Sequence, residues 1–121
     1  GILGTGENVL ICGLIVRGST PRLVLMRALG PTLEDFGVSG AAADPALRLY
    51  RGSTLIAEND NWQDQPRPEL IEALPSHLHP GDPAEAALVV ILEPGAYTIH
   101  GSSASGEGIG LLEAYDLSAK Q

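Results

Sequence analysis

The stretch that decides the fold covers residues 44–62 and reads DPALRLYRGSTLIAENDNW. Apolar and polar residues alternate on both sides of a central Arg-Gly-Ser-Thr segment. Leu47 and Leu49 share one parity before it, and Leu55 and Ala57 share one parity after it. Alternation of this kind lets a strand bury one face, and the glycine supplies the positive φ that a hairpin turn requires. The segment therefore predicts two antiparallel strands joined by a tight turn.

The rest of the composition favours more strands of the same kind. The chain has 121 residues, 44% of them hydrophobic but only 4% aromatic, with 15 glycines and 9 prolines. So many turn-forming residues suit short strands better than long helices. We expect an all-β protein, a jelly-roll-like or immunoglobulin-like antiparallel β-sandwich of about seven or eight strands. One short helix is predicted near residues 66–74. The domain is expected to span residues 8–121, after an N-terminal extension at residues 1–7.

Four further segments refine this prediction. Residues 8–17 (NVLICGLIVR) and 86–92 (AALVVIL) are apolar on both parities, which predicts strands buried on both faces. Residues 22–29 alternate, except that Arg27 falls among the apolar positions and needs a partner or an open edge. Residues 31–36 can form one helical turn, because a proline begins the segment and a glycine follows it.

The charge is strongly acidic and unevenly distributed. The net charge is −8 and the sequence pI is about 4.6, which argues against nucleic acid as a partner because phosphates bind clustered Lys and Arg. Residues 1–30 contain Arg17, Arg22 and Arg27 and one acidic residue, Glu7, so their net charge is +2. Because the whole chain carries −8, residues 31–121 carry −10. The sequence also contains no apolar run long enough to cross a membrane.

Two longer segments resemble a known domain family. They are RLVLMRALGPTLEDFGVSGAAADPALRLYRGSTLIAENDNW at 22–62 and EAALVVILEPGAYTIHGSSASGEGIGLLEAYDL at 85–117. The pattern resembles β-sandwich domains of large secreted and cell-surface proteins of environmental bacteria, and the second half is similar to bacterial pre-peptidase C-terminal domains. The resemblance implies an extracellular module without known catalytic residues.

A polar cluster in the loop after the predicted hairpin has the chemistry of a metal site. It consists of Asp44, Asn59, Asp60, Asn61 and Asp64. Calcium prefers carboxylate, amide and carbonyl oxygens of this kind. The spacing does not match an EF-hand, however, and Asn and Asp also stabilise tight loops by bonding their own backbone. A structural loop is therefore the favoured interpretation, with bound calcium as its alternative and no other cofactor expected.

The aromatic residues allow a second kind of site. Trp62 and Tyr97 could form a platform for sugar rings, although with so few aromatic residues we favour core or edge packing. His100 lies on the opposite parity to Tyr97, so it is predicted to face outward. The sequence contains no nucleophile motif of the G-x-S-x-G type, and we expect the protein not to be an enzyme.

The N-terminal tip suggests how copies could assemble. Ile2 and Leu3 form an apolar tip, which Gly4-Thr5-Gly6 separates from the next strand. Such a segment can add to the sheet edge of a neighbouring molecule, and a head-to-tail contact would give a filament. Arg17, Arg22 and Arg27 are the expected charged partners of this contact. The leading hypothesis is a non-catalytic extracellular structural subunit that forms a homopolymer. The alternative is a carbohydrate- or matrix-binding module, supported by calcium.

Overall fold

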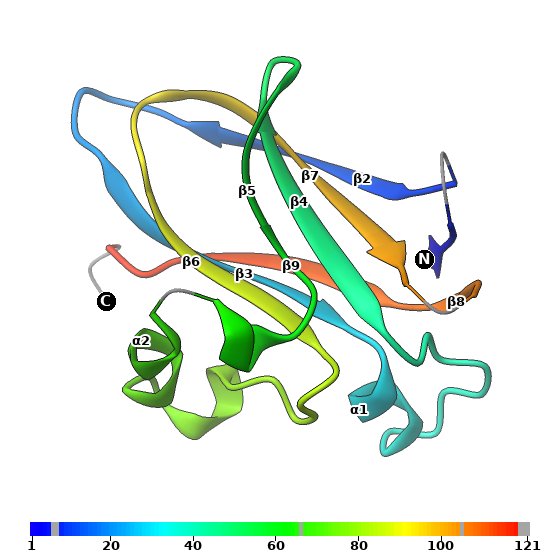
Figure 1. Cartoon of the computed structure of the whole chain (residues 1–121). Helices are drawn as coiled ribbons and strands as arrows, with labels where there is room; N and C mark the ends of the chain where they lie inside the picture. The colour runs from blue at the N-terminus through cyan, green and yellow to red at the C-terminus, as the bar shows by residue number, and fades with distance from the viewer. Residues whose placement is uncertain (6–7, 66, 105, 119–121) are drawn as a thin grey trace.

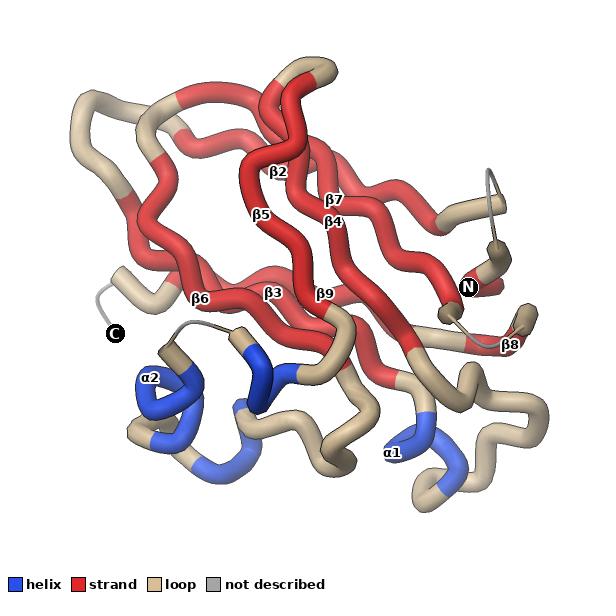
Figure 2. Tube along the Cα trace, viewed as in Figure 1, coloured by secondary structure: helices blue, strands red, loops and turns tan. Residues whose placement is uncertain are grey.

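The computed structural model describes residues 1–5, 8–65, 67–104 and 106–118, and it shows a mostly β protein with antiparallel sheets and a few short helices (Figure 2). The strands are β1 (Ile2–Leu3), β2 (Leu10–Val16), β3 (Arg22–Leu29), β4 (Pro45–Arg51), β5 (Thr54–Asn59), β6 (Ala86–Leu92), β7 (Gly95–Ser103), β8 (Gly108–Ile109) and β9 (Leu111–Asp116). The helices are α1 (Pro31–Glu34) and α2 (Pro68–Glu72), and two 3-10 turns, η1 (Trp62–Asp64) and η2 (Ser76–Leu78), accompany them. None of the helices described is long and apolar enough to span a membrane.

The strands form two main sheets and a short pair. One sheet has the order β2-β7-β4-β5 and the other has the order β6-β3-β9, while β1 pairs with β8. Neighbouring strands in all three run antiparallel. The two main sheets face each other in Figure 1, and the helical segments lie on the far side of β6 and β3 (Figure 1). The all-β prediction is confirmed at this level.

The main core lies between the two facing sheets. From β3, Val24 and Met26 point into it, and Leu49 and Ile99 meet them from the four-stranded sheet. Leu49 and Ile99 have no exposed surface, as the alternation of their strands predicts. Burying one side chain of this size stabilises the fold by roughly 1.5–3 kcal/mol. The apolar residues that alternate along the strands of both sheets therefore hold the two sheets together.

A second, smaller core lies on the other face of the three-stranded sheet. Leu25 of β3 and Ala87 of β6 pack there against Trp62 and Ile71. Because this sheet is covered on both faces, β3 is nearly continuously buried. Both β6 and β2 were expected to be buried on both faces. β6 meets this expectation except at its exposed Ile91, but β2 does not. It instead lies at a sheet edge and alternates, with every second residue exposed.

The predicted hairpin is present as β4 and β5, with Gly52 at φ +63° in the turn. Its second strand departs from the expected alternation. A β-bulge shifts the register so that Tyr50 faces Leu55 while Leu49 faces Ala57. The extra residue turns Leu55 outward, where 42% of its surface is exposed, whereas Ala57 still packs on the core. The prediction that Leu55 points to the same side as Ala57 is therefore wrong, because the bulge changes the register between them.

The two predicted helical segments are confirmed in shortened form. α1 begins at Pro31, the predicted first residue of its turn, and α2 occupies the middle of the segment 66–74. Pro66 lies outside the described residues. Proline is favoured in the first turn of a helix, because its missing N–H has no partner there anyway.

Candidate functional site

The N-terminal strand is seated on the chain's own β8. Ile2 pairs with Ile109 and Leu3 with Gly108, and Gly1 exchanges two backbone hydrogen bonds of 2.9 Å with Gly110. Of the two alternatives for this segment, docking on its own domain or on a neighbour, the structure shows the first within one chain. Residues 6 and 7 of the expected extension lie outside the described residues.

Leu3 anchors this strand in a hole lined by glycines. Its side chain has no exposed surface, whereas Ile2 is 53% exposed. A Cβ on Gly110 would lie 2.2 Å from Cδ1 of Leu3, and a Cβ on Gly101 would lie 3.2 Å from Cδ2. The glycines are therefore what gives the leucine room. Two residues of pairing with one deep anchor make a small, well-defined seat.

A tight reversal connects β1 to β2. The backbone N–H of Asn8 donates to the carbonyl of Thr5 at 3.1 Å. A Cβ on Gly4 would lie 2.3 Å from the carbonyl oxygen of Asn8, so only glycine fits this approach. The seat and the reversal together hold β1 against the end of the facing sheets.

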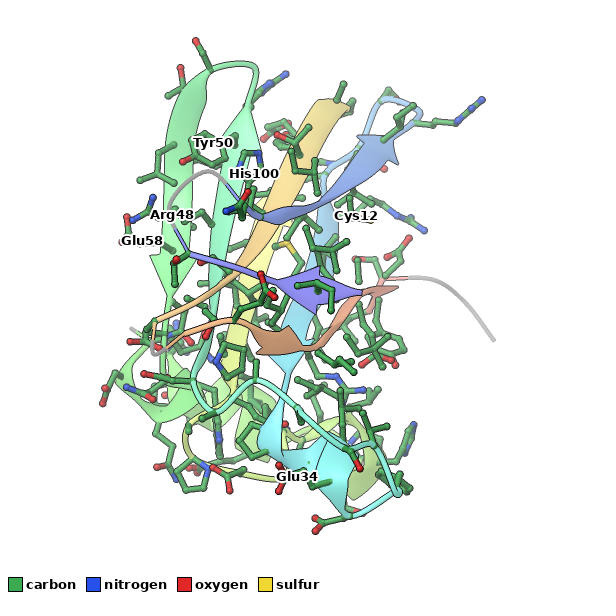
Figure 3. All side chains as sticks on the ribbon, turned by 90° about the vertical axis from the view of Figure 1, so that its right-hand side faces the viewer. Cys12, Glu34, Arg48, Tyr50, Glu58 and His100 are labelled. Atoms are coloured by element: carbon green, nitrogen blue, oxygen red, sulfur yellow. The ribbon has the colours of Figure 1, made fainter. Side chains whose placement is uncertain are left out.

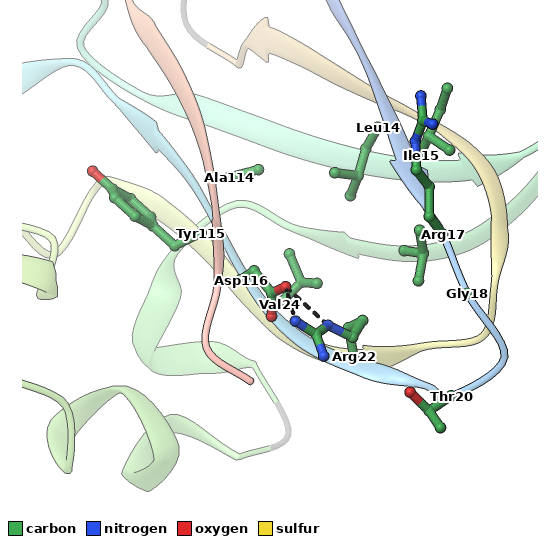
Figure 4. Close-up of a pocket in the computed structure, with 11 residues that line it drawn as sticks. Leu14, Ile15, Arg17, Gly18, Thr20, Arg22, Val24, Ala114, Tyr115 and Asp116 are labelled. Atoms are coloured by element: carbon green, nitrogen blue, oxygen red, sulfur yellow. Dashed lines mark hydrogen bonds and ion pairs between the residues drawn. The ribbon is translucent and has the colours of Figure 1, made fainter. Parts of the chain in front are cut away.

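Beyond β1, the two sheets stay open along one side. An opening of ≈660 Å³ lies between β2 and β9, and Leu14, Val16, Val24 and Ala114 contribute its apolar lining (Figure 4). Ala114 pairs with Met26 of β3, so its side chain lies on the face of the sheet that points into the core. It is nevertheless exposed to solvent. Among the described strands, β2 pairs only with β7 and β9 only with β3. The opening therefore has on each rim a strand with one unpaired edge, and none of residues 1–5 lines it.

The three arginines of the expected assembly contact have different surroundings. Arg17 lies at the rim of the opening, and Arg22 at the same rim bonds Asp116, with Nε at 2.9 Å from Oδ2. Arg27 is only 6% exposed and pairs with Glu113 of its own chain. It is therefore not available on the surface for a neighbouring copy.

Arg27 has the partner that its position in the sequence demanded. Besides Glu113, its guanidinium bonds the hydroxyl of Tyr115 and the backbone carbonyls of His77 and His79. The hydroxyl of Tyr115 also donates to Glu113 at 2.8 Å. This bond, with burial, raises the pKa of Tyr115. The network fastens the helical layer to β3 and β9.

The acidic residues of the predicted metal loop come partly together. Asp60 interacts with Asp44 and Asp64, and burial, a hydrogen bond with Asp44 and repulsion from both neighbours raise its pKa to about 6. Oδ1 of Asp44 is buried and accepts no hydrogen bond within the described part of the chain. In that same part, no group of three or more His, Cys, Asp or Glu side chains has the arrangement of a metal site.

The two asparagines of this loop have structural positions. Asn59 is buried; its Nδ2 donates to the carbonyl of Asn61 at 2.9 Å, and its Oδ1 accepts from the N–H of Ala87 at 3.0 Å. It thus ties the end of β5 to β6. This is the backbone-bonding role that the sequence favoured for the loop.

The two aromatic rings of the predicted ligand platform are both buried. Trp62 is 8% exposed in the core beneath α2, and Tyr97 is 4% exposed between the sheets, with its hydroxyl donating to the carbonyl of Glu93 at 2.6 Å. Neither ring offers a face to a ligand. Both residues therefore pack in the core, as the sequence favoured.

Sequence reasoning missed the side chains that gather on the outer face of the four-stranded sheet. Arg48, Tyr50 and Glu58 lie there beside His100, which alone was expected to point outward (Figure 3). The alternation of β4 could have identified Arg48 and Tyr50, because each lies next to a buried leucine in the sequence; Glu58 of β5 follows only from its pairing with Arg48. No family model, curated protein or solved structure matched this chain in comparisons with known proteins.

Proposed function

We propose that this protein is a non-catalytic structural subunit whose copies join by β-strand addition. In this arrangement, β1 of one copy leaves its own β8 and takes the same place on the next copy. The observation that carries the proposal is the seat of Leu3 against Gly110, where a two-residue strand is held by one fully buried side chain. A head-to-tail contact of this kind does not close on itself, so it extends into a filament.

The site that β1 occupies on its own chain and the site that it would occupy on a neighbour are identical. Leu3 would make the same contacts on a neighbour as on its own chain, so exchange loses no pairing or burial. The balance is then set by protein concentration and by the short connection between β1 and β2, where the N–H of Asn8 donates to the carbonyl of Thr5. Exchange of a terminal element between copies is a low-cost route to association.

Two further features support strand addition. The unpaired edges of β2 and β9 present backbone N–H and C=O groups that another strand can use. Arg22 and Arg27 pair with carboxylates of their own chain, but Arg17 is exposed at the rim of the opening, where it can attract the acidic remainder of another copy during encounter.

We also infer that the facing sheets form a jelly-roll-like or immunoglobulin-like β-sandwich, and that the protein acts outside the cell. The first inference is supported by the core that both sheets share. The second is supported by the resemblance to secreted bacterial domains, and an exchange-joined polymer suits a surface layer or fibre.

A pair of cysteines across the seat tests the proposal. Ile2 and Ile109 face each other in register, and the hydrogen-bonded pair Gly1–Gly110 is next to them, so they form a close, non-hydrogen-bonded pair. Ile2→Cys with Ile109→Cys, in a Cys12→Ser background, is refolded at low and at high concentration and then oxidised. We expect a ladder of disulfide-linked oligomers on a denaturing, non-reducing gel, growing with concentration.

The control places the second cysteine away from the seat. Ile2→Cys with Ile91→Cys should give no such ladder, because Ile91 is 71% exposed on β6, at the opposite edge of its sheet from β9. An intramolecular disulfide as the sole product at every concentration would refute strand exchange. A chain that begins at Asn8 should remain folded but stay monomeric in light scattering, and polymer formed without β1 would refute it as well.

A further inference from the structure

A row of side chains crosses the outer face of the four-stranded sheet. Ile11 of β2 faces His100 of β7, His100 faces Arg48 of β4, and Arg48 faces Glu58 of β5. All four lie on the parity opposite to the core. Figure 3 shows Arg48, Glu58 and His100 together on this surface, with Tyr50 beside them. One residue from each strand thus contributes to a single line across the sheet.

The row lies in a shallow groove of ≈670 Å³. Tyr50 forms part of its wall, and its ring centroid lies 4.6 Å from that of His100, with the rings tilted by 43°. Ile11, which is 58% exposed, adds an apolar side chain, and Asp60 and Ser102 add oxygens. The groove therefore combines two ring faces, an aliphatic surface and several polar groups.

Four polar side chains of this groove are not used by the fold. Arg48, Glu58, the hydroxyl of Tyr50 and the ring nitrogens of His100 make no hydrogen bond or ion pair with any residue that the structure describes. Arg22, by contrast, pairs with Asp116. A guanidinium, a carboxylate, a phenol and an imidazole are thus free to bind the same ligand.

The surroundings restrict the chemistry of that ligand. β7 and β4 are the inner strands of their sheet and are paired on both sides, so a peptide cannot add to their backbone here. The positive charge of Arg48 stands against Glu58 and Asp60, so phosphate or sulfate groups find no excess of positive charge. What remains is an uncharged ligand with an apolar face and many hydroxyl groups.

We propose that this groove binds a neutral oligosaccharide. The C–H face of a sugar ring packs on Tyr50 and Ile11, and sugar hydroxyls bond Arg48 and Glu58, a donor fork and an acceptor placed side by side. The groove is open at the surface, so it suits a linear chain of sugars lying across the strands. This site is separate from strand addition, because no residue of β1 and none of the residues that line the opening line the groove.

The test is an NMR titration of the full chain, following the backbone amides. The probes are linear oligosaccharides of glucose, of xylose and of N-acetylglucosamine, with a sulfated oligosaccharide for contrast, each up to millimolar concentration. We expect at least one neutral probe to shift amides of β4 and β7 around Tyr50 and His100. Tyr50→Ala and Arg48→Ala should each weaken that binding by about tenfold or more.

Arg17→Ala is the matched control, because Arg17 is also exposed and unpaired among the described residues but lies outside the groove. It should leave the affinity unchanged. Tyr50→Phe keeps the ring and should retain most of the binding, which separates stacking from loss of folding. The proposal is overturned if no neutral probe binds, if binding survives Tyr50→Ala and Arg48→Ala in folded protein, or if only the sulfated probe binds and salt abolishes it.

Discussion

The buried carboxylate of Glu85 holds Thr32 by two hydrogen bonds, one from its hydroxyl at 2.5 Å and one from its backbone N–H at 3.0 Å. Glu85 has no exposed surface, and it also accepts from the N–H groups of Gly30 and Asp82. An ionised group can be buried only when hydrogen bonds of this kind replace its water. One side chain therefore ties the start of α1 to the loop before β6.

Glu85→Gln should destabilise the protein by about 3 kcal/mol or more, because the new amide group turns two donors toward backbone N–H groups that already need an acceptor. Thr32→Val removes one of the four hydrogen bonds and should cost about 1–1.5 kcal/mol. Urea unfolding monitored by Trp62 fluorescence measures both. Thr54→Val, at the exposed start of β5, is the control and should change stability little. A Glu85→Gln protein as stable as the original would show that the four bonds contribute little.

The fit between Leu3 and Gly110 predicts strongly non-additive mutations. Leu3→Ala empties a fully buried position and should cost about 2–5 kcal/mol, while Ile2→Ala at the exposed neighbour should stay within about 0.5 kcal/mol. Gly110→Ala should cost about 1–3 kcal/mol, because its Cβ meets the leucine at 2.2 Å.

In the double variant the new methyl group has space, so the combined loss should be smaller than the sum of the two single losses. Chemical denaturation of the four proteins closes this cycle. Strict additivity would mean that Leu3 does not occupy the hole beside Gly110 in solution.

Local alternation was sufficient to predict much of the core. The hairpin, the inward parity of Leu47 and Leu49, and that of Tyr97 and Ile99 all follow from a period of two residues. The order of strands does not follow from it. β2 and β3 are both rich in apolar residues, yet the first lies at an edge and the second in the centre, because a layer of helices happens to cover the second sheet.

The candidate sites were harder to predict for the same reason. The seat of Leu3 depends on Gly108 and Gly110, near the other end of the chain, and alternation carries no information about such a distant partner. For Trp62 the sequence favoured packing over a ligand platform, but it did not show which element would cover the ring. It is buried because the turn that follows β5 folds it beneath α2. His100 was correctly expected to face outward, since its parity alone decides it.

Two arginines of β3 allow a comparison of a buried and an exposed ion pair on the same strands. Arg27 pairs with Glu113 at 6% exposure, whereas the Arg22 and Asp116 side chains are 35% and 40% exposed. Arg27→Met removes the positive partner of Glu113, which keeps only the hydroxyl of Tyr115 among its described partners, and the donor of two backbone carbonyls, so it should cost about 3–5 kcal/mol. Arg22→Met should cost at most about 1 kcal/mol.

Hydrogen exchange provides the second measurement for this pair. Arg27→Met should also increase exchange in the segment 76–79, whose carbonyls the guanidinium holds, while Arg22→Met should not. Equal losses of stability in the two variants would contradict the anchoring role of Arg27.

Asp60 should make the protein slightly more stable in mild acid. Its pKa rises from the ordinary 3.8 to about 6, through burial, a hydrogen bond with Asp44 and repulsion from Asp44 and Asp64. The folded protein therefore binds this proton more tightly than the unfolded chain does. Its contribution to stability grows as the pH falls through about 6 and is complete below about 3.8. Because Asp60 is exposed to solvent, we expect less than about 1 kcal/mol.

The titration of the Asp60 carboxyl carbon by NMR measures this directly. Asp64→Asn removes one repulsive neighbour and should lower the midpoint, while Asp60→Asn should raise stability at neutral pH and remove its share of the pH dependence. A midpoint near the ordinary 3.8 in the unmodified protein would mean that the three carboxylates lie further apart than the structure has them.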